Sequence, residues 1–384
     1  MNRKLKDNIL KGCVYASAGF TLLILFVIIG FIFVKGAPNL SIDFLTRNYE
    51  NTTTYAFITK DQNVKEGSES GYISTLGITV TLDPEGYLVI KDIDKTSPTN
   101  KAVDGNQNAF TIKKGDQITK VGKDDIGKMI EGGASLSDVI HTINYQEDET
   151  MKVKVVKPGG GILPMVVTTI YMILLSIAIA APIGVCASIY LNEYAKKGRL
   201  TSTIHFAIES LAGIPSIIYG LFGSVCFVKT LKLQYSILAG ALTVSIMLLP
   251  IIISTTEETL KAIPQGYRES SLGLGATKLQ TISKVVLPNA IPGILVALLL
   301  SIGRVVGESA ALLLTAGTVA QIPKALFGNG ASGATLTIKA YTLMKEENDL
   351  GTACAIGIVL LVIIICLNIL SKWVANKFIK KRGI

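Results

Sequence analysis

Arg304 and Glu308 are the residues whose position best suits chemistry, because they are the only charged residues in the apolar run 285–323. An ionised side chain at the middle of a bilayer costs roughly 2.5–3.5 kcal/mol, so neither is expected to face lipid. A spacing of four places both on one helix face, about 6 Å apart along the axis, and predicts an ion pair. The shared face could line a path for an anion, with Arg304 donating hydrogen bonds and Glu308 limiting how tightly the anion binds. The alternative is that the two charges only neutralise each other or pair with another subunit, and Glu209 is a weaker third candidate.

The sequence shows no arrangement of residues that is typical of a catalytic or metal-binding site. The only histidines are His141 and His205, and neither H-E-x-x-H nor G-x-S-x-G occurs. The segment 122–129 imitates a phosphate-binding loop, but Met129 stands where a Ser or Thr would hold Mg²⁺. We therefore expect no catalytic residue, no metal and no cofactor.

Long apolar runs are the elements that must position these charges. Of 384 residues, 49% are hydrophobic, and roughly 20 helical residues cross a bilayer core of about 30 Å. Six runs are long enough, namely 12–34, 159–192, 210–228, 233–256, 285–323 and 350–371. The sequence therefore predicts an all-α polytopic membrane protein with six transmembrane helices. Its parts are an N-terminal tail and first helix (1–35), an inserted region (36–158) and a core of five helices (159–384).

The distribution of basic residues predicts the orientation. The segments 3–11, 196–199, 261–284 and 372–382 contain sixteen Lys and Arg residues, whereas 229–232 and 324–345, on the other side, contain five. By the positive-inside rule both termini are cytoplasmic and residues 36–158 lie outside. The net charge of +9 reflects this bias, so it does not indicate nucleic-acid binding.

The inserted region is charged and rich in short alternating segments, which predicts a small α+β domain. Gly-Asp-x-Ile before a strand (115–118) and Ser-Leu-x-Asp at a helix start (135–138) resemble bacterial PDZ-like domains over about 72–157. In such domains the backbone N–H groups of one loop bind a peptide C-terminus. Leu76, Gly77 and Ile78 are the best candidate for that loop. The alternative is a domain that packs on a partner without binding peptide.

A spaced motif lies between the fourth and fifth predicted helices. Glu269, Ser270 and Ser271 form a triplet, Gly275 stands four residues after the triplet, and nine residues later the string 285–288 ends in Leu287 and Pro288. The segment 257–288 resembles the EAA loop of ABC importer permeases, with Ser270 and Ser271 where alanines are usual.

The EAA resemblance implies contact with an ATPase subunit. We expect two short helices joined at Gly275, since glycine readily adopts the left-handed conformation of a sharp corner. Arg268 is expected to contact the ATPase, and Pro288 to end the helix pair where the next span begins. Four apolar residues would dock in a groove on the ATPase: Leu272, Leu274, Leu279 and Ile282.

Four further segments, 160–164, 190–194, 209–217 and 303–311, are similar to PstA-type phosphate permeases. The similarity covers 1–50 and 159–384. It implies the ABC importer permease fold in the cell membrane, in contact with lipid. It also implies that the chain translocates phosphate and is not an enzyme, because the ATPase hydrolyses the ATP. The implied partners are a PstC-like second permease, a PstB-like ATPase dimer and a PstS-like phosphate-binding protein.

Two alternatives remain on the sequence alone. A permease for another oxyanion, such as molybdate or sulfate, would keep the EAA loop, although Arg304, Glu308 and the segment 209–217 favour phosphate. A PDZ-bearing membrane protease would need a zinc pair or a nucleophile with its base, and the sequence offers neither.

Overall fold

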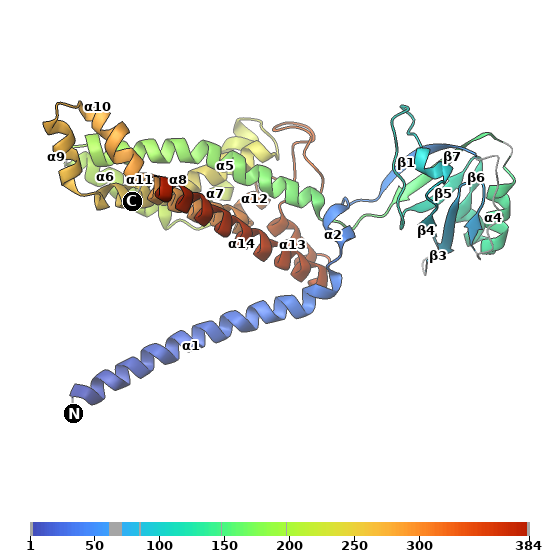
Figure 1. Ribbon diagram of the computed structural model, residues 1–384, viewed down its shortest axis with the longest axis horizontal. Helices are drawn as coiled ribbons and strands as arrows, with labels where there is room; N and C mark the ends of the chain where they lie inside the picture. The colour runs from blue at the N-terminus through green and yellow to red at the C-terminus, as the bar shows by residue number, and fades with distance from the viewer. Residues whose placement is uncertain (1–2, 61–70, 84–85, 147, 197, 382–384) are drawn as a thin grey trace. The chain divides into compact units, whose positions relative to one another are not determined.

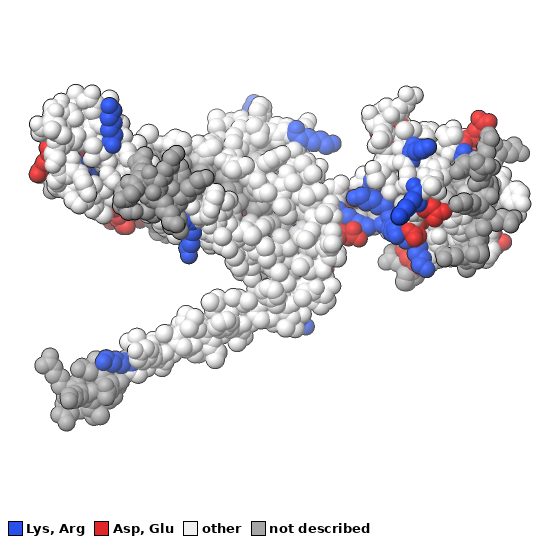
Figure 2. All heavy atoms as spheres, viewed as in Figure 1, with Lys and Arg blue, Asp and Glu red and all other residues white. Residues whose placement is uncertain are grey.

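The computed structural model describes residues 3–60, 71–83, 86–146, 148–196 and 198–381. These residues form two compact units, which are described separately (Figure 1). The membrane unit comprises Met1–Leu45 and Ile162–Ile384, and the inserted unit comprises Thr46–Gly161. Figure 2 shows few charged side chains along the helices of the membrane unit and many over the inserted unit.

The membrane unit is helical, as predicted, and five helical segments of its described part are long and apolar enough to cross a bilayer. They are Lys11–Asn39, Leu163–Tyr194, Ile237–Ala262, Lys278–Gly307 and Leu350–Leu370. The helices are α1 (Arg3–Gly36), α2 (Ile42–Thr46), α5 (Leu163–Ile189), α6 (Arg199–Ala212), α7 (Ser216–Gly223), α8 (Ile237–Ala262), α9 (Gln265–Gly273), α10 (Lys278–Thr281), α11 (Leu287–Gly307), α12 (Ala310–Leu313), α13 (Leu336–Lys345) and α14 (Leu350–Lys381). Three π-helical segments extend them: η3 (Tyr190–Tyr194), η4 (Ser224–Thr230) and η5 (Ile282–Val286).

The predicted third span, 210–228, is not one straight helix. It consists of the end of α6 and the segment Ser216–Thr230, and the two axes differ by 99°. Pro215 at the corner has ψ 141°, and Ile214 before it is disfavoured from the helical conformation by the proline ring. The described part of the chain therefore has five helical segments that could span a bilayer, or six if this bent pair crosses as one.

The apolar run 285–323 contains a long helix only in its first part. Helix α11 ends at Gly307, and Glu308 is extended with φ −80° and ψ 125°. A four-residue helix, α12, follows, and Gly317 has φ +91°. The prediction that Arg304 and Glu308 share one helix face is therefore wrong, because the helix ends between them.

Helices α5, α8, α11 and α14 lie side by side in a bundle (Figure 1). Small residues allow the closest approaches: a Cβ atom at Gly184 of α5 would lie 2.7 Å from Ile252 Cγ2 of α8. The Ser245 hydroxyl of α8 also hydrogen-bonds the Ser176 carbonyl oxygen of α5 at 3.1 Å. Small residues and hydroxyl groups at helix contacts are typical of packing inside membranes, where apolar burial alone gives little preference for one neighbour.

The inserted unit contains one antiparallel sheet in the order β1-β7-β5-β4-β3-β2, with β6 paired to β5. The strands are β1 (Thr52–Thr59), β2 (Tyr72–Ile73), β3 (Ile78–Leu82), β4 (Leu88–Ile93), β5 (Gln117–Val121), β6 (Asp124–Asp125) and β7 (Thr150–Lys157). Strand β1 pairs with β7 over all eight residues, from Thr52 opposite Lys157 to Thr59 opposite Thr150. The compact unit is therefore larger than the predicted 72–157.

Two short helices, α3 (Ile126–Glu131) and α4 (Leu136–Asn144), pack on one face of this sheet. The predicted start of α4 is confirmed: Ser135 and Asp138 form a capping box. Ile126, Val139 and Ile143 join the apolar side chains of the strands in one buried core.

Candidate functional site

The segment between α8 and α11 forms two short helices joined at a glycine, as predicted. Helix α9 ends at Gly273, and Gly275 has φ +83° with no atom within 4 Å of a Cβ placed there. Thr277 then begins α10 in a capping box with Gln280. We call Gln265–Thr281 the coupling hairpin.

The tip of the coupling hairpin presents apolar side chains to solvent. Leu274 is 89% exposed, Leu279 67%, Tyr267 55% and Leu272 49%. Clustered exposed apolar side chains are typical of a protein interface. Ile282 is only 5% exposed, so the prediction that it docks outside this chain is wrong.

The predicted triplet of the hairpin is divided between surface and interior. Glu269 and Ser270 are exposed, and thus available to another protein. Ser271 is half-buried, and its hydroxyl lies 2.9 Å from the Thr281 hydroxyl of α10. Ser271 therefore holds α9 and α10 together, which an alanine at this position could not do by hydrogen bonding.

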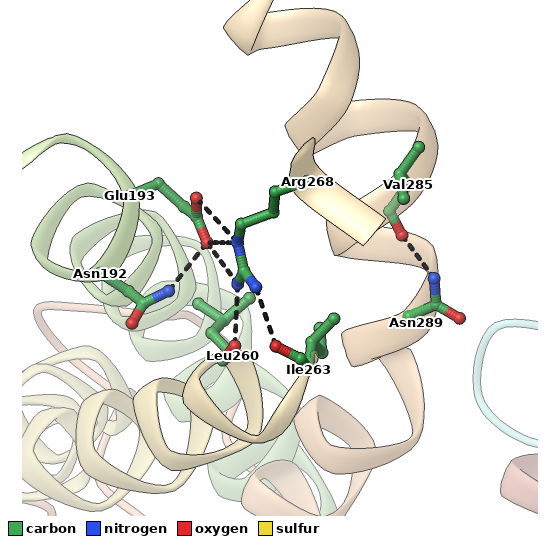
Figure 3. Close-up of polar contacts among 7 residues, drawn as sticks. All are labelled: Asn192, Glu193, Leu260, Ile263, Arg268, Val285 and Asn289. Carbon is green, nitrogen blue, oxygen red and sulfur yellow. Dashed lines mark hydrogen bonds and ion pairs between the residues drawn. The ribbon is translucent and has the colours of Figure 1, made fainter. Parts of the chain in front are cut away.

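Arg268 turns away from the exposed tip and into the membrane unit (Figure 3). Its Nη2 atom lies 2.8 Å from Glu193 Oε1 and its Nε atom 3.2 Å from the same oxygen. The guanidinium also donates to the carbonyl oxygens of Leu260 and Ile263, each at 2.9 Å, and Asn192 Nδ2 donates to Glu193 Oε1 at 2.8 Å. Arg268 thus forms several bonds within this chain, and its contact with the ATPase stays a prediction.

This group, which we call the arginine latch, joins three elements. Arg268 belongs to α9, Glu193 to η3 at the end of α5, and the two carbonyls to the end of α8. Both side chains are nearly buried, at 13% and 7% exposed. The arginine latch therefore ties α9 to the ends of α5 and α8 through charge-assisted hydrogen bonds, which are stronger than neutral ones.

The other side of the hairpin continues directly into a membrane helix. Residues Lys278–Gly307 form one continuous helical stretch, so Pro288 does not end the pair as predicted. Pro288 has no N–H to donate to Lys284, and the preceding turn, η5, is π-helical. Asn289 Nδ2 donates to the Val285 carbonyl oxygen at 2.7 Å beside that turn (Figure 3), and Leu287 and Pro288 are half-buried in the first turn of α11.

The three predicted pathway residues are not brought together by ion pairs within the described part of the chain. Arg304 is exposed on the last turn of α11, and Glu209 is exposed on α6. Glu308 is 7% exposed; its Oε1 accepts from the Ala311 N–H at 3.1 Å, and its carbonyl oxygen accepts from the Thr337 hydroxyl at 2.8 Å. Glu308 therefore stabilises the bend after α11 through its bonds to Ala311 and Thr337, and Arg304 takes no part in them.

Sequence reasoning missed the acidic partner of the latch. In the predicted orientation, Glu193 lies at the cytoplasmic end of a long apolar run. An acidic residue among the basic residues of that end was the sequence signal that could have identified it. A second buried carboxylate was also missed: Glu257 of α8, 6% exposed, lies 2.7 Å from Lys261 and 3.5 Å from His205.

The loop proposed to bind a carboxylate in the inserted unit has its donors occupied. The N–H groups of Leu76 and Gly77 donate to the Ile73 carbonyl oxygen at 3.3 and 2.9 Å. The Leu76 carbonyl oxygen accepts from the Ser97 and Thr99 hydroxyls, and Ile78 is buried in the core. This geometry does not favour capture of a peptide C-terminus there.

Residues 180–380, about half of the chain, match the family described as binding-protein-dependent transport system inner membrane component. This region contains the coupling hairpin, both sides of the arginine latch and the three predicted pathway residues. The inserted unit lies outside the matched residues.

Curated relatives match about half of the chain's length. The chain is 37% identical over 168 residues to the probable ABC transporter permease protein YqgI of Bacillus subtilis, covering 44% of this chain and 57% of that protein. It is 39% identical over 189 residues to a phosphate transport system permease protein PstA homolog of Mycoplasma pneumoniae, covering 48% and 29%. It is 35% identical over 212 residues to phosphate transport system permease protein PstA 1 of Mycobacterium tuberculosis, covering 55% and 68%. The chain thus spans less than two thirds of the first two relatives.

Proposed function

The chain belongs to the family of binding-protein-dependent transport system inner membrane components, and on this basis we propose that it is the permease subunit of an ATP-driven importer of inorganic phosphate. The observation that carries the importer assignment is the coupling hairpin, with its exposed apolar tip and its latched base. Relatives named as phosphate permeases at 35–39% identity support the substrate.

The proposed partners are the other subunits of such an importer. A pair of PstB-type ATPase subunits receives the coupling hairpin and hydrolyses ATP, a PstC-type permease completes the pathway, and a PstS-type protein delivers phosphate. The chain lies in the cell membrane with both termini cytoplasmic and the inserted unit outside, supported by the sixteen-to-five bias of basic residues.

Arg304 is the proposed pathway residue, and Glu209 of α6 is a weaker candidate. Arg304 is the only charged residue of α11, and a planar guanidinium suits bidentate binding of a phosphate. Glu308 acts through the bend that follows Arg304, because its carboxylate and carbonyl oxygens are both bonded there.

Uptake measurements test the substrate. In a strain lacking its own phosphate importers, this chain expressed with the proposed partner subunits should restore ATP-dependent uptake of labelled phosphate. A tenfold excess of unlabelled phosphate should lower the uptake of label about tenfold by competition for one site. The same excess of sulfate or molybdate should leave it nearly unchanged. Uptake of molybdate or sulfate instead would assign the alternative oxyanion and reject phosphate.

A glycine pair tests the corner of the coupling hairpin. Alanine at Gly275 must adopt φ +83°, which costs about 1–2 kcal/mol and should weaken co-purification with the ATPase about fivefold to thirtyfold. Gly273 is the matched control, because it also has open space around it but no positive φ. Gly273→Ala should bind the ATPase normally. Equal binding by both variants would show that the corner at Gly275 is not needed for docking.

A further inference from the structure

The sheet of the inserted unit has one edge closed by the chain's own segment 71–75. The Val80 N–H of β3 donates to the Gly71 carbonyl oxygen at 2.8 Å, and Ile73 pairs with Ile78. A hydrogen bond of 2.7 Å joins the Tyr72 hydroxyl to Asp94; that bond, with burial and the charge of Asp94, raises the pKa of Tyr72 to about 12. The contact therefore persists at neutral pH, and a peptide cannot add to β3 at these residues without displacing the segment.

The anchoring of this segment extends to helix α4. The Ser74 hydroxyl, the Thr75 hydroxyl and the Thr75 N–H all donate to Asn144 Oδ1, at 3.1, 3.0 and 3.2 Å. Ile73 is fully buried in the core. The edge of β3, where an added strand would have to pair, is thus covered by a well-bonded part of the unit itself.

The opposite edge of the sheet is also partly closed. The Phe57 N–H of β1 donates to the Val103 carbonyl oxygen at 2.8 Å, and the Val103 N–H donates back to Phe57 at 3.1 Å. Own-chain pairing at an edge is a common way to prevent unwanted strand addition. Recognition by this unit is therefore better sought on a sheet face than on an edge.

One face of the sheet carries lysines and aromatic side chains in neighbouring positions. Tyr55 of β1 is opposite Lys154 of β7, and Lys154 is opposite Lys120 of β5. Lys152 is opposite Phe57, one step further along the same face. The helices α3 and α4 pack on the other face, where the alternate residues of these strands are buried. We call Tyr55, Phe57, Lys120, Lys152 and Lys154 the cationic face.

The charges on this face work against the stability of the sheet. Like charges directly opposite each other on adjacent strands are destabilising, and Lys120 and Lys154 are such a pair. Asp125 lies 2.9 Å from Lys120 and relieves part of the repulsion. The Lys152 ammonium lies 4.3 Å from the centre of the Tyr55 ring, a contact that holds the cation in place. Three lysines beside one acidic residue favour an anionic partner.

We propose that the cationic face binds an acidic segment of an extracytoplasmic polypeptide, a role beyond the translocation of phosphate. Lys152 and Lys154 are two residues apart on one strand, so their side chains project about 7 Å apart. Alternate carboxylates of an extended acidic chain repeat at the same distance. Tyr55 is 43% exposed beside them, and tyrosine is among the residues enriched at protein interfaces.

The test uses the full chain in an uncharged detergent and a fluorescent poly-L-glutamate peptide as the probe. The anisotropy of the peptide should rise on binding at low salt and fall as salt screens the ion pairs. Replacing Lys120, Lys152 and Lys154 together by glutamine should weaken binding at least about tenfold, as expected from the loss of three exposed ion pairs.

The matched control removes the same charge elsewhere on the inserted unit. Lys95, Lys101 and Lys128 are exposed and lie outside the sheet, so their replacement by glutamine should leave the affinity within about twofold, as expected for residues outside the interface. Circular dichroism checks that both variants are folded. Equal losses in both variants would mean that only net charge matters, and binding to anionic lipid vesicles without binding to polyglutamate would assign the face to a membrane. Either result would overturn the proposal.

Discussion

Replacing Arg304 by glutamine is expected to reduce phosphate uptake at least about tenfold while leaving assembly with the partner subunits intact. Arg304 is exposed in the isolated chain and is the only charged residue of α11. A charge left in lipid is costly, so we expect this face to meet a partner helix across a polar path. A hydrogen bond to a charged group contributes about 1.5–3 kcal/mol, which converts to roughly tenfold to 150-fold in uptake.

The second variant, Glu308→Gln, separates the two proposed roles. Glutamine retains an oxygen that can accept from the Ala311 N–H, so the bend after α11 should survive. Since Arg304 and Glu308 form no ion pair here, the double variant should transport no better than Arg304→Gln alone. Recovery of uptake in the double variant would show direct charge pairing and would contradict the pathway role of Arg304. Arg304→Lys should recover only part of the uptake, because lysine cannot bind a phosphate in the bidentate manner of arginine.

The sequence predicted the features that depend on local geometry. Gly275 was expected at a corner because few other residues adopt a positive φ, and its φ is +83°. Ser135 and Asp138 were expected to start a helix, and they form the capping box of α4. Such signals involve residues within about four positions of each other, which is the range of turn and cap hydrogen bonds.

The features that the sequence reading missed depend on distant residues or on competing local signals. Strand β1 belongs to the inserted sheet because it pairs with β7, about a hundred residues later, and hydrophobic alternation alone cannot reveal that pairing. The run 285–323 is apolar apart from Arg304 and Glu308, so its hydropathy does not reveal the end of α11 at Gly307. The role of Arg268 could not be predicted because its carboxylate partner is 75 positions away.

The arginine latch should be the most sensitive point of the coupling mechanism. Arg268→Gln leaves the Glu193 carboxylate, 7% exposed, without its positively charged partner. Glu193→Gln leaves the Arg268 guanidinium without its negatively charged partner. Removal of one partner of a buried ion pair typically costs about 3–5 kcal/mol. We expect each single variant to lower the midpoint of thermal unfolding and to abolish phosphate uptake. ATP hydrolysis by the assembled complex should then continue without transport, because the latch no longer ties α9 to the ends of α5 and α8.

The double variant Arg268→Gln with Glu193→Gln distinguishes a structural role from a coupling role. Two neutral amides leave no buried charge, so the unfolding midpoint should recover most of its loss. The charge-assisted bonds to Glu193 and to the Leu260 and Ile263 carbonyls would still be absent or weaker. Uptake should therefore stay low in a protein that is stable again.

Lys284→Gln, an exposed change in η5 on the other side of the hairpin, should leave both stability and uptake nearly unchanged. If the stable double variant transports as well as the original chain, the latch only stabilises the fold and does not carry motion from the coupling hairpin to the membrane helices.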